Sequence, residues 1–369
     1  MKRITLFLIM TAIITTAAAR ERRFSHIDTR EAAQTLAQCF AEHNRARDEA
    51  RKVLPLSDYL TGEDSHYWTD GNAVYVSLYD PDTRTVTLDN KEVLNPDDVV
   101  KRSAMPEIKI TRGKATLAGE PRTAVTVERL GASVMLVARD ARGVPTRALH
   151  HITLDDINAR HHQMLPLFLL SGNYATPSGN HAVFGPKMDF YEGDKYDRDP
   201  GIFNYRHDPE AGTVSILYGD GRVSGGDPSS SKYGKMPGGG GAGALMGPME
   251  WSVKPTVQGL DVTVVVDHKF VRHSPAIDGH AALTRVQGPF EGLDGKWTFA
   301  SVLPLNHYLI SFFPPEVRKL IRAEIYARHG DTFRDPATQA YFDAQPWYRR
   351  SGRPVRLTAV ERFNATLLK

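Results

Sequence analysis

The 369-residue sequence contains one cysteine, Cys39, so an internal disulfide is excluded. Cys39 lies on the apolar face of an expected helix, which favours a buried thiol. An excess of charge is also lacking, because 46 basic and 43 acidic residues leave a net charge of +3. A balance this close gives no electrostatic reason to expect nucleic acid as a partner.

The short motifs that mark common catalytic sites are also missing. The sequence has no G-x-S-x-G nucleophile elbow and no H-E-x-x-H zinc motif. Gly238, Gly240 and Gly243 satisfy G-x-G-x-x-G, but neither a strand before them nor a helix after them is indicated. We therefore predict no cofactor, and we interpret residues 224–248 as a glycine-rich loop.

Long apolar runs are scarce, and the main one lies at the N-terminus. Two basic residues precede an apolar run over residues 4–14, and an A-x-A pattern over residues 17–19 follows. This order is typical of a secretory signal peptide, and the run is short for a membrane span. We expect cleavage near Ala19, and a periplasmic or secreted protein with no stable membrane span. An uncleaved N-terminal anchor is the alternative.

Residues 20–160 are expected to form a helix followed by a small β-rich domain. Apolar residues recur at helical spacing from about Thr29 to Val53. Further on, apolar and polar residues alternate in short runs separated by turn residues, which indicates antiparallel hairpins. We expect a small twisted sheet packed against the helix, with strands near residues 73–79, 84–88, 107–110, 123–127 and 133–138.

Residues 161–302 are expected to form an antiparallel β-domain, as a meander, a sandwich or a small barrel. The segment His161 to Leu170 indicates a short apolar helix or an entry strand. Short strands separated by Gly, Asp and Pro turns then follow. If the domain is a barrel, its interior could hold an apolar ligand. The expected strands lie near residues 181–184, 190–191, 201–205, 213–218, 249–254, 260–267, 281–286 and 296–302.

Four histidines near the junction of these two regions are candidate metal ligands: His150, His151, His161 and His162. Neutral histidine is a common metal ligand, and two aspartates stand between the two pairs. Adjacent residues of a strand point to opposite faces, so only one histidine of each pair could serve a single site. A solvated edge between strand and helix is the alternative, and we adopt it as the default.

Residues 303–369 are expected to form a module of three short helices. Pro315 and Glu316 suit a helix start, and Glu324 stands four residues before Arg328 in the favourable order for an ion pair. A second helix begins after Asp335, and Thr358 begins a capping box for the third. Alone, so small a unit would be only marginally stable.

This module carries a distinctive pattern, R-x-E-I-Y-A-R-H-G, from Arg322 to Gly330. With the later residues it resembles the YARHG domain, an extracellular module found at the ends of otherwise unrelated bacterial proteins. Ala323 departs from the pattern, which usually has asparagine there. The resemblance implies an extracytoplasmic location and no catalytic role, because none is assigned to the family. The later matching residues are Phe333, Tyr341, Phe342, Trp347, Tyr348, Glu361 and Asn364.

The same module supplies the candidate binding residues: Tyr326, Arg328, His329, Tyr341, Phe342, Trp347 and Tyr348. A histidine near a glutamate can perform general acid–base catalysis. The structural alternative, which we favour, is a hydrogen-bonded cluster of Glu324, Arg328 and His329 that supports the end of the helix. The aromatic residues would then be core.

The predicted fold class is α+β, with an N-terminal helix and small sheet, an antiparallel β-domain and a helical C-terminal module. We expect a non-enzymatic binding or accessory protein of the bacterial envelope. Its partner would be an extracytoplasmic protein or a cell-wall component, bound through the C-terminal module. Two alternatives stay open. One is an envelope hydrolase with its site in the central β-domain, metal-dependent through the four histidines; the other is a carrier of a small apolar ligand.

Overall fold

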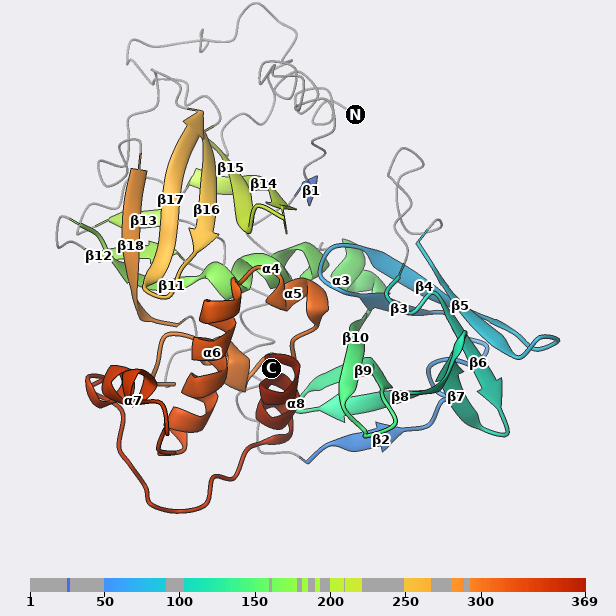
Figure 1. Ribbon diagram of the computed structural model, residues 1–369. Coiled ribbons are helices and arrows are strands. Elements are labelled where there is room, and N and C mark those ends of the chain that lie inside the picture. Colours follow the sequence, from blue (N-terminus) through green and yellow to red (C-terminus); the bar gives the residue numbers. More distant parts are fainter. Residues whose placement is uncertain are drawn as a thin grey trace, which may run out of the picture. The chain divides into compact units, whose positions relative to one another are not determined.

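The computed structural model describes residues 25–26, 50–90, 103–158, 161–177, 181–184, 190–192, 200–208, 210–220, 249–266, 280–288 and 293–369 (Figure 1). The chain divides into two compact units. The barrel unit comprises residues 31–169 and 287–369, and the sheet unit comprises residues 1–30 and 170–286. The expected signal peptide, the expected helix up to residue 49 and the glycine-rich loop lie outside the described residues. None of the described helices has the length and apolar character needed to cross a membrane.

Eight strands of the barrel unit form a closed antiparallel barrel. Each strand pairs with the next one along the chain, and the last strand, β10, returns to pair with the first, β3. A short strand, β2 (Lys52–Leu54), pairs with one end of β8. The barrel strands are β3 (His66–Thr69), β4 (Val74–Asp80), β5 (Thr85–Asp89), β6 (Glu107–Thr111), β7 (Lys114–Leu117), β8 (Glu120–Leu130), β9 (Ser133–Arg139) and β10 (Pro145–Ile152).

Side chains that point alternately into and out of the barrel explain why apolar residues fill its interior. In β6, Ile108 and Ile110 are buried, whereas Glu107, Lys109 and Thr111, which alternate with them, are exposed. Because successive side chains of a strand point to opposite faces, one apolar set from every strand meets inside. Eight strands leave an interior that side chains can fill. The buried residues of this cluster include Trp68, Tyr75, Val86, Leu88, Ile108, Leu117, Val125, Val127, Leu136, Ala138 and Leu149.

The five strands expected in this region are confirmed, and three more were missed: β3, β7 and β10. The expected small twisted sheet is antiparallel as predicted, but the return of β10 to β3 closes its strands into a barrel. The predicted C-terminal end of the helix, near Val53, is also wrong, because residues 52–54 pair with β8 as a strand. Ring closure depends on pairing between residues about 80 positions apart, which local alternation does not reveal.

The sheet unit contains a nine-stranded sheet in the order β1-β14-β15-β16-β17-β18-β11-β12-β13. The predicted antiparallel meander is confirmed for the successive strands β14 to β18. Among the described strands no pairing joins the two edges, so this sheet is open where a sandwich or barrel was considered. Its strands are β1 (Ser25–His26), β11 (Gly172–Ala175), β12 (His181–Phe184), β13 (Phe190–Glu192), β14 (Pro200–Asp208), β15 (Thr213–Asp220), β16 (Met249–Pro255), β17 (Gly259–Val266) and β18 (His280–Gln287).

The described helices follow the barrel and complete its unit at the C-terminal end. The predicted N-caps are confirmed, because Asp335 accepts from the Thr338 amide and Thr358 forms a full capping box. The strand expected at residues 296–302 is wrong, because a buried 3₁₀ turn, η2 (Thr298–Ser301), occupies it. A short apolar run does not by itself distinguish strand from helix. The helices are α3 (Leu154–Asn158), α4 (His161–Leu170), α5 (His307–Ile310), α6 (Pro315–Arg328), α7 (Pro336–Asp343) and α8 (Ala359–Leu367).

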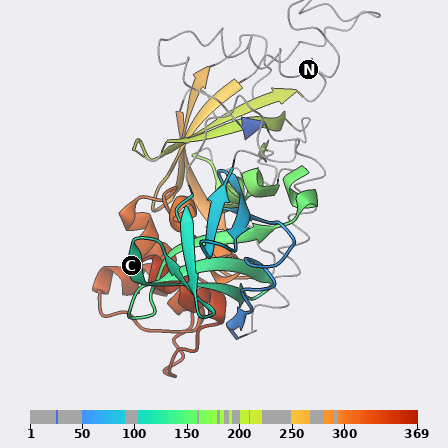
Figure 2. The ribbon, with the colours of Figure 1, turned by 90° about the vertical axis from the view of Figure 1, so that its right-hand side faces the viewer.

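The C-terminal helices lie beside the barrel (Figure 2), and α8 shares a hydrophobic core with it. Val360 and Phe363 of α8 pack on the outer face of β8, β9 and β10. At the start of α5, the Asn306 amide donates to the Asp70 carbonyl at 2.9 Å, in the turn between β3 and β4. The barrel therefore supplies the apolar surface that so small a helical module lacks by itself. The residues of the shared cluster are Leu130, Met135, Val137, Ala148, Ala359, Val360 and Phe363.

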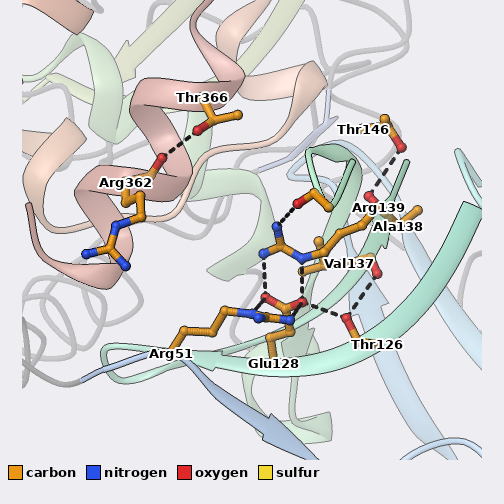
Figure 3. Close-up of polar contacts among 10 residues, drawn as sticks. Arg51, Thr126, Glu128, Val137, Ala138, Arg139, Thr146, Arg362 and Thr366 are labelled. Carbon is orange, nitrogen blue, oxygen red and sulfur yellow. Dashed lines mark hydrogen bonds and ion pairs between the residues drawn. The ribbon is translucent and has the colours of Figure 1, made fainter. Parts of the chain in front are cut away.

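A buried carboxylate on the outer face of β8 joins β2, β8 and β9 (Figure 3). Glu128 is fully buried and accepts paired hydrogen bonds of 2.7–2.8 Å from Arg51 and from Arg139. Thr126 donates a further hydrogen bond at 2.6 Å. Burial alone would raise the pKa of Glu128, but the hydrogen bonds from Arg139 and Arg51 outweigh it and lower the pKa to about 2. Arg139 also lies over the Phe363 ring, which connects this network to α8.

Replacement of this carboxylate should destabilise the barrel unit strongly. We expect Glu128→Gln to lower the free energy of unfolding by about 3 kcal/mol, because two arginines lose their buried partner. The pKa of Glu128 is depressed, so its contribution is complete above pH 4.5 and disappears as the pH falls toward 2. Urea unfolding at pH 7 and at pH 3 measures both effects. Glu120→Gln, which removes a solvent-exposed pair with Arg147, is the control, and an equally large loss there would contradict the prediction.

Candidate functional site

The motif helix α6 holds a buried carboxylate against the loop that precedes η2. Glu324 is 1% exposed and accepts hydrogen bonds from the Lys296 amide at 2.8 Å and the Trp297 amide at 2.7 Å. Arg328, one turn later on the same helix, completes the predicted ion pair with Glu324. Gly295 permits this approach, because a Cβ there would lie 2.6 Å from the Glu324 Oε1 atom. Glu324 therefore holds the loop before η2 in place.

A second carboxylate connects three elements of the same module. Glu361, in the first turn of α8, accepts from the Ser301 hydroxyl of η2 at 2.7 Å and contacts His329 Nε2 at 2.8 Å. Arg328 Nε donates to the same Ser301 hydroxyl at 3.0 Å. Burial alone would raise the pKa of Glu361, but the hydrogen bonds from His329, Ser301 and the Thr358 amide outweigh it and lower the pKa. The charged residues of the motif thus bind one another and the backbone.

Two further motif positions also contact the backbone. Asn364 is fully buried, donates to the Ala300 and Leu303 carbonyls at 2.8 Å, and accepts from the Leu305 amide at 2.8 Å. Arg322 Nε donates to the Ala365 carbonyl at 2.9 Å. Together these contacts tie α6, η2 and α8 into what we call the polar clamp: Ser301, Arg322, Glu324, Arg328, His329, Glu361 and Asn364.

The geometry of the polar clamp is unsuited to nucleophilic catalysis. A catalytic serine gives its proton to a histidine that a carboxylate orients. Here the order differs, because Glu361 stands between the serine and the histidine and accepts from both. Ser301 is also only 3% exposed. The hydrogen-bonded cluster expected of Glu324, Arg328 and His329 is present, with Ser301 and Glu361 added.

The aromatic residues of the module form a small core beside the clamp. Phe342 is fully buried and lies 5.0 Å from the Phe333 ring in a stacked arrangement. Tyr348 is 5% exposed and belongs to the same cluster. Of the candidate binding residues, Phe342 and Tyr348 are therefore packing residues. Tyr326, Tyr341 and Trp347 are half-buried and keep some exposed surface.

Sequence reasoning missed a run of arginines between α7 and α8. Arg349, Arg350, Arg353 and Arg356 lie in this connection, and all four side chains are exposed. The signal was available, because no acidic residue occurs between Asp343 and Glu361. Attention to the aromatic and histidine positions of the motif concealed it. We name residues 349–356 the arginine loop.

The histidines form two separate groups, one of which lies inside the barrel. His151 of β10 and His66 of β3 place their Nε2 and Nδ1 atoms 3.1 Å apart. Tyr59 and Trp68 enclose this pair with ring centroids 5.1–5.4 Å from one or both histidines. Burial and the neighbouring His66 lower the pKa of His151 to about 4. The His151 imidazole is therefore uncharged at neutral pH.

His150, His161 and His162 lie outside the barrel interior and are 5–7% exposed. The default expectation of a solvated edge is wrong, because these side chains are buried. His161 Nδ1 contacts Asp156 Oδ1 at 2.8 Å, so this aspartate joins α3 to α4. Within the described part of the chain, no group of three or more His, Cys, Asp or Glu side chains could hold a metal ion. His150 and His151 point to opposite faces of β10, as expected.

The glycine beside the clamp provides a test of its contribution to stability. We expect Gly295→Ala to lower the free energy of unfolding by about 3 kcal/mol or more, because φ is +119° and the added Cβ meets Glu324. Gly352→Ala is the matched control, with φ +62° and no atom within 4 Å of the added Cβ. It should cost only about 1 kcal/mol. Thermal and urea unfolding measure the free energy of unfolding of both variants. Equal losses in the two would contradict the stabilising role of the polar clamp.

The histidine pair predicts a pH dependence of stability. The folded-state pKa of His151 is about 4, below its ordinary value of 6.5, so the unfolded chain takes up a proton first as the pH falls. Stability should decrease by on the order of 2 kcal/mol between pH 6.5 and pH 4, allowing for partial exposure. His151→Phe keeps a ring between Tyr59 and Trp68 and should flatten this slope. An unchanged slope in urea unfolding across that range would refute the assignment.

Comparison with protein-family models matches residues 316–369 to the YARHG domain. The match confirms the resemblance drawn from the motif, and it covers α8 and all but the first residue of α6. It supports an extracytoplasmic protein. Comparisons with curated proteins and with solved structures found no match to the chain. The C-terminal segment that carries the aromatic cluster, the arginine loop and every residue of the polar clamp except Ser301 is therefore a YARHG domain.

Proposed function

We propose that this chain is a non-enzymatic binding or accessory protein of the bacterial envelope, and that its YARHG domain is the element that contacts a partner. The partner is an extracytoplasmic protein or a cell-wall component. The barrel acts as the rigid support on which the domain is mounted. This proposal goes beyond the family match, which concerns residues 316–369.

One observation carries the proposal. The charged motif residues that a catalytic site would use are engaged in the polar clamp, with Glu324 and Glu361 buried and hydrogen-bonded. A catalytic group must reach its substrate, whereas these groups contact η2, α6 and α8. The exposed surface of the domain includes the arginine loop, and the half-buried Trp347 precedes this loop. Such a surface suits recognition better than chemistry.

The two alternatives have less support in the same geometry. The expected carrier would hold its ligand inside a barrel of residues 161–302, but the described strands of that region form a sheet whose edges do not pair with each other. A metal-dependent hydrolase needs converging ligands, and among the described residues the histidines occupy different faces of β10 and α4. We therefore give preference to the binding function.

Site-specific photocrosslinking in intact cells tests the proposal. A photoreactive phenylalanine analogue at Pro354, an exposed position of the arginine loop, should give adducts of higher mass with an envelope component. The matched control carries the same analogue at Lys114, an exposed position of the hairpin between β6 and β7. Adducts at position 354 that are absent at position 114 support the proposal. Adducts only from position 114, or from neither position, would overturn it.

Substitution is preferable to truncation in this experiment. Removal of the C-terminal helices would uncover Leu130, Met135 and Val137 on the barrel, which α8 covers in the intact unit. A truncated chain would then lose partners through misfolding alone. Both crosslinking positions are exposed, one in a loop and one at the first residue of β7, so both chains are expected to keep the wild-type melting temperature.

A further inference from the structure

The positive charge of this chain is concentrated in the YARHG domain. Residues 316–369 contain eleven basic and six acidic residues, a net charge of +5, whereas the whole chain carries +3. The remaining residues therefore carry a net negative charge. Within the domain, residues 344–360 contain four arginines and no acidic residue. A patch of this kind creates a local field that attracts anionic partners.

Most of the arginine loop has no carboxylate partner. Arg350 pairs with Asp343, and its Nε atom lies 3.2 Å from Asp343 Oδ1. Among the residues that the structure describes, the Arg349 side chain donates only to a backbone carbonyl, that of Tyr348, at 2.7 Å. Arg353 and Arg356 are exposed, and within the described part of the chain their side chains form no hydrogen bond or ion pair. Three of the four guanidinium charges are thus uncompensated.

The loop is held in place at both ends. The Ser351 amide donates to the Gly330 carbonyl at 2.9 Å, at the end of the motif helix. A Cβ on Gly330 would lie 2.6 Å from the Arg349 carbonyl oxygen, so the motif glycine allows this close approach. At the other end, Arg362 of α8 donates to the Leu357 carbonyl at 3.2 Å. The arginines are therefore presented by an anchored loop, which reduces the ordering cost of binding.

We propose that the arginine loop docks the protein onto a membrane surface rich in anionic phosphate headgroups. The inference rests on the proposed function of the YARHG domain as the interaction element. Guanidinium groups bind phosphate through paired hydrogen bonds. Trp347 lies two residues before Arg349 and is half-buried, and tryptophan favours the boundary between lipid and water.

A membrane fits this surface better than a small anion does. The three uncompensated arginines occupy positions 349, 353 and 356 of an exposed loop, and such a row of cations suits a partner that presents many phosphates. Each basic residue near an anionic membrane strengthens binding by about fivefold. Three arginines should therefore contribute roughly a hundredfold. The attraction should weaken as salt shortens the range of the field.

Vesicle co-sedimentation with the full mature chain tests this inference. Vesicles of phosphatidylcholine with about one third phosphatidylglycerol should bind the protein, and vesicles of phosphatidylcholine alone should not. The triple variant Arg349→Gln, Arg353→Gln, Arg356→Gln should bind on the order of a hundredfold more weakly. Wild-type binding should also fall when salt is raised to about 0.5 M. A melting temperature of the variant equal to that of the wild type would establish that the variant is folded.

The matched control removes the same charge elsewhere. Lys109→Gln, Lys114→Gln, Arg122→Gln takes three cations from exposed barrel positions. Unchanged vesicle binding by this control supports the arginine loop as the specific binding element. A loss equal to that of the triple arginine variant would overturn the inference. Absence of binding to the anionic vesicles, or binding to soluble polyphosphate alone, would also overturn it. A protein crosslinked to the analogue at position 354, without any vesicle binding, would refute the membrane as the partner. The proposed function would remain intact.

Discussion

The buried carboxylate of Glu361 is the interaction on which the C-terminal half of the barrel unit depends. It joins the first turn of α8 to Ser301 of η2 and to His329 at the end of α6. With α8 fixed in this way, Phe363 reaches the barrel and lies against Arg139. A buried acid is costly unless its oxygen atoms are satisfied, and here three donors satisfy them. The helices and the barrel thus share one core.

This arrangement gives the YARHG motif a structural meaning. Glu324 fixes the loop before η2, Arg328 and His329 connect the two carboxylates, and Gly330 admits the arginine loop. The most recognisable residues of the domain therefore build its scaffold, whereas the arginines between α7 and α8 are exposed. The charged motif residues and the exposed arginines are thus different sets of residues.

Sequence reasoning succeeded where the signal was local. Helix caps at Asp335 and Thr358, the ion pair of Glu324 with Arg328, and most strand positions follow from side chains within a few residues of one another. It failed for residues 296–302, where a short apolar run forms a 3₁₀ turn. It also assigned His161 and His162 to a solvated edge, whereas both side chains are buried.

The sequence by itself determined the YARHG resemblance, the alternation of the strands and the excess of arginine near the C-terminus, since each is a property of neighbouring residues. Only the tertiary structure decided that β10 closes the barrel on β3 and that α8 covers its outer face. It also decided that Glu128 lies between Arg51 and Arg139. These features bring together residues separated by tens to hundreds of positions, and their pairing depends on packing and burial that no local pattern encodes.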